Sequence, residues 1–244
     1  MRVEFLGTGG YHPNERRQTT CVMLPELGII FDAGTAFFRV SSRIRTPEIH
    51  IFLSHAHLDH IVGLTYILSA FATGTLKRAH IHAADPTLAA VREHLFAREL
   101  FPVMPAYEFH SLAERVEVPE RGVLTHIPLS HPGGSIGYRI DWPGKSLAFV
   151  TDTTVDGSYA EFVRGVGLLI HECYLPDSRG EWAKKTGHSH TTPVAELARD
   201  AEVGQLLLIH IDPCFTEADP IDLKQARTIF PRTELAEDLM VVEF

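Results

Sequence analysis

Cysteine is scarce in this chain, and its scarcity excludes two kinds of structural site. The cysteines are Cys21, Cys173 and Cys214, and no two of them form a CxxC pair. An odd number of widely spaced thiols supports neither a disulfide framework nor a thiolate zinc site. We therefore expect three reduced cysteines in a protein of the cytoplasm.

Basic residues are also in deficit, which bears on binding partners. The chain has 22 Lys and Arg against 31 Asp and Glu, a formal net charge of −9. Sequence-independent binding to nucleic acid needs a basic surface, so we do not expect it here. A phosphate-bearing substrate stays compatible with this charge, because bound divalent cations can reverse the local potential.

Long hydrophobic runs are missing as well. No apolar run approaches the roughly 18 residues that a membrane-spanning helix needs. The N-terminal sequence MRVEFLGTGG lacks the basic segment and apolar stretch of a signal peptide. No linker-like or low-complexity tract interrupts the chain. We expect no membrane association, a cytoplasmic location and a single domain covering residues 1–244.

The pattern of apolar residues predicts an α/β fold. Short apolar runs bounded by Gly, Pro and Asp indicate strands, expected at Val3–Leu6, Thr20–Leu24, Ile29–Asp32, Glu48–Ser54, His80–Ala83, Val123–Leu129, Ile136–Ile140, Ser146–Thr151, Gly167–His171, Leu206–Ile211 and Leu239–Phe244. Helices are expected at Ala36–Ile44, Ile61–Ala72, Pro86–Glu99, Tyr159–Val163, Thr192–Ala201 and Pro220–Ile229. Meander-like strands with helices in both halves favour two sheets with outer helices.

Histidine is abundant, with 15 residues, and four ligand-type side chains crowd into the segment His55–His60, which reads HAHLDH. In extended backbone, residues two apart share a side, so His55, His57 and Asp59 can converge. A turn into the following helix brings His60 nearby. The composition gives this motif a chance expectation of about 0.003 per chain. Imidazoles and a carboxylate at this density suit two adjacent zinc, manganese or iron ions.

The HAHLDH segment resembles the HxHxDH signature of the metallo-β-lactamase superfamily. In that family a His, an Asp and a last His follow at later strand ends. This sequence has His131 after an apolar strand, Asp152 after the next core strand and His210 after a late strand. The resemblance therefore runs over nearly the whole chain. It implies the four-layer αββα sandwich of that superfamily.

The resemblance also implies a ligand set of two divalent metal ions, with zinc preferred and manganese or iron as alternatives. One ion would be held by three histidines, and these are His55, His57 and His131. The other would be held by Asp59, His60 and His210, with Asp152 bridging the two ions. Asp32 is either a support for a ligand imidazole or a residue that forms a turn before Gly34.

Two further segments look like motifs of the tRNase Z-like phosphodiesterase branch. His171-Glu172-Cys173 is similar to its HEA motif, and Gly187-His188-Ser189 to its HST motif. In that branch the Glu orients a His that assists the leaving oxygen, so we assign catalytic roles to Glu172 and His188, together with Asp59. His190 is the alternative to His188, and His171 is expected to be structural.

The function that follows is a metal-dependent hydrolase. The resemblance implies a metal-bridging hydroxide that attacks a small phosphodiester, such as a cyclic nucleotide or a cyclic phosphate. The tRNA-processing enzymes carry a basic arm between the positions of His131 and Asp152, where this chain has only residues 132–151. Three alternatives stay open: a hydrolase of lactones, thioesters or carboxylic esters; a tRNA 3′-processing endonuclease; and a non-hydrolytic metal protein.

Several other features receive only default interpretations. The remaining histidines are expected to be surface or strand-face residues, and they include His12, His50, His80, His82, His94, His110 and His126. Loops at Phe101–Tyr107 and Pro176–Thr186 are expected to set substrate specificity. Relatives in the superfamily are often dimers, so the resemblance leaves a homodimer open.

Overall fold

The computed structural model describes all 244 residues, which divide into two compact units. The first unit comprises residues 1–113 and 238–243, and the second comprises residues 114–237 and 244. Each unit is built on one seven-stranded sheet. None of the helices combines the length and the apolar character that crossing a membrane requires.

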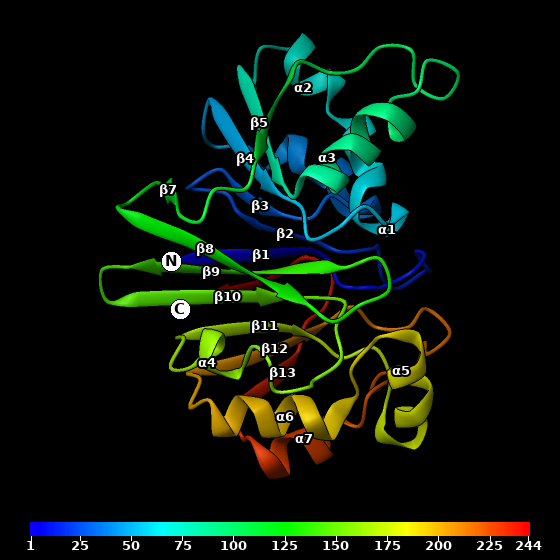
Figure 1. The fold of residues 1–244 in the computed structure, drawn as a ribbon, viewed down its shortest axis with the longest axis vertical. Coiled ribbons are helices and arrows are strands. Elements are labelled where there is room, and N and C mark those ends of the chain that lie inside the picture. The colour runs from blue at the N-terminus through cyan, green and yellow to red at the C-terminus, as the bar shows by residue number, and fades with distance from the viewer. The chain divides into compact units, whose positions relative to one another are not determined.

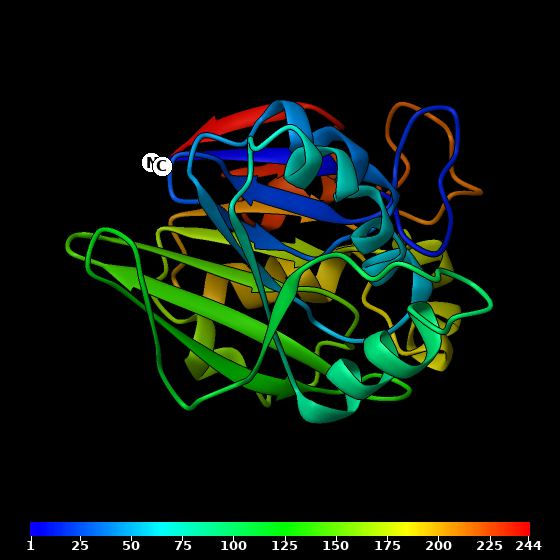
Figure 2. The same cartoon turned by 90° about the horizontal axis from the view of Figure 1, so that it is seen from above.

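The first unit contains a mixed sheet with the order β14-β1-β2-β3-β4-β5-β6. Its strands are β1 (Arg2–Gly7), β2 (Cys21–Leu24), β3 (Ile29–Phe31), β4 (Glu48–Phe52), β5 (Arg78–Ala83), β6 (Tyr107–Ser111) and β14 (Met240–Glu243). The pairs from β14 to β3 are antiparallel, and the pairs from β3 to β6 are parallel. Figure 2 shows β14, in red, running beside β1, in dark blue.

Helices cover one face of this sheet because its strands alternate apolar and polar residues. Ile49 and Ile51 of β4 and Ile81 of β5 join a buried cluster with Phe37 and Leu88 of the helices. Side chains at the intervening positions therefore lie on the opposite face. The helical segments are η1 (Thr35–Ser42), α1 (Leu58–Ile61), η2 (Val62–Tyr66), α2 (Leu68–Ala72), α3 (Asp85–Ala90) and η3 (Val91–Leu95).

The second unit contains a mixed sheet with the order β13-β12-β11-β10-β9-β8-β7. Its strands are β7 (Val116–Val118), β8 (Gly122–Leu129), β9 (Ser135–Trp142), β10 (Lys145–Val150), β11 (Leu168–Glu172), β12 (Gln205–Ile209) and β13 (Thr233–Leu235). The four strands from β10 to β13 are parallel, whereas β7, β8, β9 and β10 pair antiparallel. The strand β8 therefore runs in the same direction as β10.

The helices α6 and α7 lie along one face of the second sheet (Figure 1). Val194 and Ala198 of α6 pack with Leu169 of β11 and Leu208 of β12 in a buried cluster. The helical segments of this unit are α4 (Ala160–Val163), η4 (Asp177–Arg179), α5 (Gly180–Thr186), α6 (Thr191–Asp200) and α7 (Leu223–Ile229).

The expected helix at Ile61–Ala72 is broken into α1, η2 and α2. A continuous helix would need the Gly63 amide to donate to the carbonyl of Asp59. The Gly63 amide donates instead to the Ala33 carbonyl at 2.8 Å, and the Asp59 carbonyl accepts a hydrogen bond from Thr19 Oγ1 at 2.8 Å. Tertiary hydrogen bonds thus replace the helical ones at this point.

Other differences from the sequence-based expectation are smaller. The helix expected at Pro86–Glu99 ends at Leu95 as the π-helical segment η3. The strands β6, β7 and β13 were not expected. The helices η4 and α5 occupy much of the segment Pro176–Thr186 that was expected to be a loop.

Candidate metal centre

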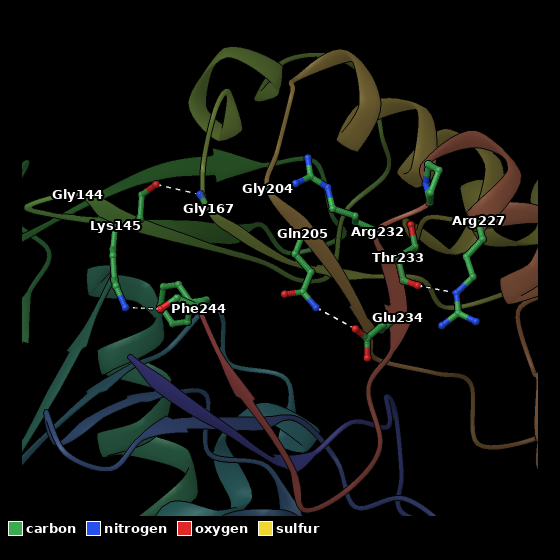
Figure 3. A pocket seen from close by; sticks show the side chains of 12 residues that line it. Gly144, Lys145, Gly167, Gly204, Gln205, Arg227, Arg232, Thr233, Glu234 and Phe244 are labelled. Carbon is green, nitrogen blue, oxygen red and sulfur yellow. Dashed lines mark hydrogen bonds between the residues drawn. The ribbon is translucent and has the colours of Figure 1, made fainter.

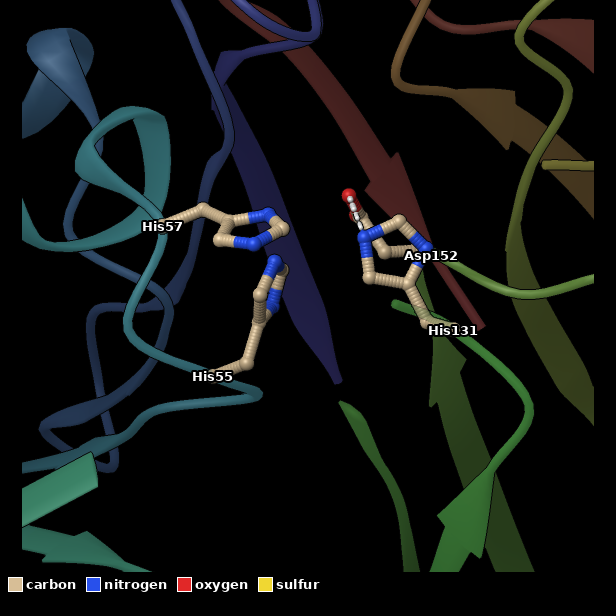
Figure 4. A group of neighbouring side chains, drawn as sticks. All are labelled: His55, His57, His131 and Asp152. Atoms are coloured by element: carbon tan, nitrogen blue, oxygen red, sulfur yellow. Dashed lines mark ion pairs between the residues drawn. The ribbon is translucent and has the colours of Figure 1, made fainter. Parts of the chain in front are cut away.

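The first unit presents a group of ligand-type side chains directly after β4. The backbone leaves the strand at Phe52, and α1 begins at Leu58. The rings of His55 and His57 meet edge to face with centroids 4.4 Å apart (Figure 4). The ring centroid of His60 is also 4.4 Å from that of His55. The extended stretch and the turn that follows it therefore gather three imidazoles, as the motif predicts.

Asp32 fixes the orientation of one of these imidazoles. Its carboxylate is fully buried and accepts hydrogen bonds from the Ser54 amide at 2.7 Å, from Ser54 Oγ at 2.8 Å and from His60 Nδ1 at 2.8 Å. Because Nδ1 of His60 is used in this way, Nε2 is the nitrogen that can bind a metal ion. That Nε2 lies 3.2 Å from Asp59 Oδ2. Of the two roles considered for Asp32, support of a ligand imidazole is the one the contacts favour.

Gly34 and Gly63 allow the segment that follows Asp32 to lie close to the ligand loop, which comprises residues His55–His60. A Cβ added at Gly34 would lie 2.3 Å from the Asp59 carbonyl oxygen, and one added at Gly63 would lie 2.2 Å from the Gly34 carbonyl oxygen. Both contacts are shorter than any side chain tolerates. The Ala33 amide also donates to the His60 carbonyl at 2.8 Å. Backbone contacts thus hold the ligand loop against the end of β3.

The second unit gathers its candidate ligands at one edge of its sheet. His131 follows β8, Asp152 follows β10, and His210 follows β12. Since these three strands run in the same direction, their carboxyl ends meet at the same edge. Asp152 and His210 adopt left-handed backbone conformations, with φ of 48° and 59°. The turn at each strand end is therefore sharp.

The Asp152 carboxylate lies between two histidines. Its Oδ1 is 3.3 Å from His210 Nε2, and its Oδ2 is 3.7 Å from His131 Nε2, the ion pair drawn in Figure 4. Nδ1 of His131 is hydrogen bonded to the Gly187 carbonyl at 2.9 Å, which leaves Nε2 to face the carboxylate. Burial lowers the pKa of His131, against the opposing effect of the Asp152 charge.

The donor set of each unit fits a divalent transition metal. Two atoms bound about 2.1 Å from one tetrahedral zinc ion are about 3.4 Å apart. The separations of 3.2 Å for His60 and Asp59, and of 3.3 Å and 3.7 Å around Asp152, are close to that value. Each carboxylate oxygen of Asp152 faces a different histidine, the arrangement expected of a carboxylate that bridges two ions.

His188, which is partly exposed, pairs with the buried Glu172 in the second unit. Glu172 is fully buried, and its Oε1 accepts a hydrogen bond from His188 Nδ1 at 3.0 Å. The amides of Thr153 and Ser189 donate to the same carboxylate at 2.7 Å and 3.1 Å. The ring of Tyr174 stacks on that of His188 with centroids 4.4 Å apart. The His188 ring is thus held in one orientation, with Nε2 turned away from Glu172.

The neighbouring histidines have other partners. His190 Nδ1 lies 2.7 Å from Asp177 Oδ1. Its contacts therefore differ from those of His188, which alone of the two is paired with Glu172. His171 is fully buried, with Nε2 hydrogen bonded to the Tyr159 hydroxyl at 2.8 Å, and burial lowers its pKa. These contacts match the structural role expected for His171.

A cavity of the second unit lies away from these residues. It has a volume of about 730 Å³ and is lined by Lys145, Gln205, Arg232, Thr233 and Phe244, among others (Figure 3). These residues stand at the amino ends of β10, β12 and β13 or beside them. Asp152, Glu172 and His210 stand at the carboxyl ends, where open α/β sheets place their ligands. The cavity is therefore separate from the candidate metal ligands.

A smaller pocket of about 260 Å³ lies beside His131. Its lining includes Lys184 and Lys185 of α5, together with Gly187 and Thr154. The sequence pattern predicted a loop for this segment, and the two lysines were therefore missed. Two consecutive lysines are typical of the last turn of a helix, and this pattern could have indicated a helix that ends near Lys184 and Lys185.

Comparison with known proteins places the chain in a family. The model of the beta-lactamase superfamily domain matches residues 28–211, which is more than half of the chain. A curated relative, Ribonuclease Z of Prochlorococcus marinus (strain MIT 9313), is 26% identical over 312 aligned positions that cover 100% of this chain and 98% of the relative. Those 312 positions exceed the 244 residues of this chain by 68, so the relative carries additional segments.

Solved structures share the fold over the whole chain. The metallo-beta-lactamase fold protein YhfI from Bacillus subtilis has a TM-score of 0.85 at 19% identity and covers 99% of each chain. Human tRNase Z, short form, has a TM-score of 0.77 at 22% identity, covering 100% of this chain and 99% of that one. The predicted metallo-β-lactamase type of α/β fold is thereby confirmed.

Proposed function

The chain belongs to the metallo-β-lactamase superfamily of metal-dependent hydrolases, and from this premise we propose that it is a phosphodiesterase acting on a small phosphodiester. Two divalent cations are its cofactors, zinc in the first place. One would be held by His55, His57 and His131. The other would be held by Asp59, His60 and His210, and Asp152 would be a ligand of both.

The observation that carries the proposal is the pairing of His188 with the buried Glu172, joined at 3.0 Å. An alkoxide leaves poorly from phosphorus unless it is protonated, so phosphodiester cleavage needs a general acid. Glu172 engages Nδ1 of His188, and the proton passes to the leaving oxygen from Nε2. Hydrolysis of thioesters needs such an acid less, because a thiolate leaves more readily than an alkoxide.

Two lysines and a tyrosine near His131 and His188 position the substrate and the general acid. Lys184 and Lys185 line the pocket beside His131 and attract a phosphate group. When bound, the cations supply Lewis-acid charge and lower the pKa of water near the phosphorus. Tyr174 holds the His188 ring by stacking, which keeps Nε2 directed at the leaving oxygen.

A small substrate is favoured by what lies between His131 and Asp152. Residues 132–151 are used by β9 and β10 and the short connections beside them. This segment leaves no room for the basic arm by which tRNA-processing enzymes grip their substrate. The net charge of −9 also disfavours a large polyanion.

A second candidate function is tRNA 3′ processing. It is supported by the relatives named Ribonuclease Z, which align over 100% of this chain at 26–28% identity. On this alternative the RNA would be bound without the arm, by residues of the sandwich itself.

The test is hydrolysis of bis(p-nitrophenyl) phosphate by protein loaded with zinc or manganese. Asp152→Ala serves as the blank, and Asp141→Asn, at an exposed carboxylate of β9, serves as the matched control. We expect turnover in the wild type and the control, and none in the blank. No turnover by wild-type protein that holds its metal ions would refute the phosphodiesterase assignment.

The same preparations decide between the two substrates. A precursor tRNA with a 3′ trailer should be cut slowly or not at all, and raising the salt concentration should change little. Efficient, salt-sensitive cleavage of the precursor would instead favour tRNA processing, because binding of a polyanion weakens steeply with salt.

A further inference from the structure

Four histidines and two glutamates share one face of the first sheet. They lie on three adjacent parallel strands: Glu48 and His50 on β4, His80 and His82 on β5, and Glu108 and His110 on β6. The strand register pairs His50 with His80 and His80 with Glu108, and also pairs His82 with His110. Their positions alternate with the apolar residues that pack against the helices, so all six side chains project from the opposite face.

The rings of this histidine cluster are in direct contact. His50 stacks on His80 with centroids 4.6 Å apart, and His82 stacks on His110 at 4.8 Å. His80 and His82 are only 8% and 7% exposed. Imidazoles packed so closely in the interior each need a partner for both ring nitrogens.

One hydrogen bond uses Nδ1 of His50, and a second uses Nδ1 of His80. His50 Nδ1 lies 3.1 Å from His82 Nε2, and His80 Nδ1 lies 3.0 Å from His110 Nε2. His82 and His110 thus orient the rings of His50 and His80 by hydrogen bonds. Imidazoles that bind metal ions are commonly oriented in this way by neighbouring groups. The opposite nitrogens of His50 and His80 are then the ones available to an ion.

The Nε2 atom of His80 has no hydrogen-bond partner although it is buried. It lies 3.6 Å from Glu48 Oε2. When His80 donates its Nδ1 proton to His110, its Nε2 carries a lone pair and faces a carboxylate oxygen at a distance close to the roughly 3.4 Å between two ligands of one zinc ion. A cation between them would remove the mismatch.

Arg78 binds only one carboxylate oxygen of Glu48, and the other oxygen can therefore bind a cation. Its guanidinium binds Glu48 Oε1, with Nε at 2.9 Å. The other oxygen, Oε2, is the one directed at His80. The Glu48 side chain is 34% exposed, so an ion can reach the group from solvent.

We propose that Glu48, His50 and His80 form a second site for a divalent transition metal ion, with Glu48 bound through Oε2. The ligand atoms of these three residues lie within 4.8 Å of one another. Two imidazoles and one carboxylate select zinc, nickel or copper over calcium or magnesium. The ion cross-links β4 and β5 and keeps an open coordination position, since the protein supplies three ligands.

The test counts zinc ions per chain. Wild-type protein is dialysed against buffered zinc and analysed by mass spectrometry, together with His80→Phe, which keeps the ring stack but removes the ligand. His126→Phe, at a strand-face histidine of β8 outside the cluster, is the matched control. We expect His80→Phe to bind one zinc ion fewer than the wild type and the control, with unchanged hydrolytic activity. Equal counts in all three proteins would overturn the proposal.

A second variant keeps the test decisive if His80→Phe does not fold. Glu48→Gln retains the shape of a partly exposed side chain and removes its charge. We expect its additional zinc ion to bind at least about tenfold more weakly, because loss of a charged ligand should cost at least as much as the loss of a carboxylate that only supports a ligand. A zinc-binding curve that matches the wild-type curve would count against the site.

Discussion

Replacing Asp32 by Asn tests how the first unit prepares its ligands. The Asp32 carboxylate accepts three hydrogen bonds, from the amide and hydroxyl of Ser54 and from His60 Nδ1. Asn has nearly the same shape, but one of its two terminal atoms is a donor. If the amide nitrogen faces His60, it meets an N–H donor, and if it faces the Ser54 amide, it meets another.

The conflict is relieved only if His60 changes its tautomer. With Nδ1 unprotonated, the proton of His60 moves to Nε2, the nitrogen that would otherwise bind a metal ion. Loss of a supporting carboxylate typically weakens metal binding about 10–100-fold, or by about 1.4–2.8 kcal/mol. The metal-free protein should lose about 1–3 kcal/mol of stability, because hydrogen bonds to a charged group are replaced by neutral ones.

The assay is a zinc competition against a chromophoric chelator, together with urea unfolding in the presence of EDTA. Asp141→Asn again serves as the control. A zinc affinity of Asp32→Asn equal to that of the wild type would refute the reasoning, because it would mean that the tautomer of His60 does not matter. A loss of stability without any loss of zinc affinity would lead to the same conclusion.

Three more predictions can be checked with standard assays. On a cyclic nucleotide, whose leaving oxygen is an alkoxide, His188→Ala should retain its metal ions but lower kcat by about 10²–10⁴ as a general acid is lost, whereas His190→Ala should change kcat little; equal losses would remove the distinction between them. Gly63→Ala should destabilise the protein by about 1–3 kcal/mol in urea unfolding, since the added Cβ would lie 2.2 Å from the Gly34 carbonyl oxygen; unchanged stability would show that the loop can move. Burial, reinforced by neighbouring histidines, lowers the pKa of His50 to about 4 and that of His82 to about 3. The unfolded chain therefore binds more protons between pH 6.5 and pH 4, and the free energy of unfolding of EDTA-treated protein should fall as the pH falls through this window, by up to about 2.7 kcal/mol per pH unit for two protons. His50→Phe combined with His82→Phe should flatten that slope, and an equal slope in the variant would contradict the assignment.

Much of the ligand loop could be predicted from the sequence because its geometry is local. The HxHxDH spacing follows from a strand that turns into a helix, and His55, His57 and His60 do gather at that turn. The positions of Asp152 and His210 were predicted from apolar strands that end at each of them. The structure places both at the carboxyl edge of the second sheet, with Asp152 beside His210 at 3.3 Å.

The histidine cluster could not be predicted in this way. His50, His80 and His110 are about 30 residues apart, and only the register of three parallel strands makes them neighbours. A one-residue shift in that register would turn a strand's histidines toward the helices. A single sequence indicates strand positions but not register, so these residues were expected only as separate surface or strand-face histidines.

The broken helix at Ile61–Ala72 has a related cause. Its apolar pattern is compatible with one continuous helix, and the competing hydrogen bonds come from Thr19 and Ala33, about 30–40 residues away. Local periodicity contains no information about such distant partners. For the same reason the apolar pattern did not predict β13, because β13 pairs with β12 and the helix α7 lies between them in the sequence.

The left-handed backbone at Asp32, Asp152 and His210 has a consequence for engineering. Their φ angles are 57°, 48° and 59°, and such a conformation costs a residue with a side chain about 1–2 kcal/mol. Glycine at Asp152 or His210 would relieve that strain in the metal-free protein, whereas glycine at Asp32 would also remove three buried hydrogen bonds. A directed-evolution screen that rewards thermal stability alone, with chelator present, should therefore enrich glycine at Asp152 and His210 and select against the hydrolase it was meant to improve. Libraries for this scaffold should hold these three codons fixed.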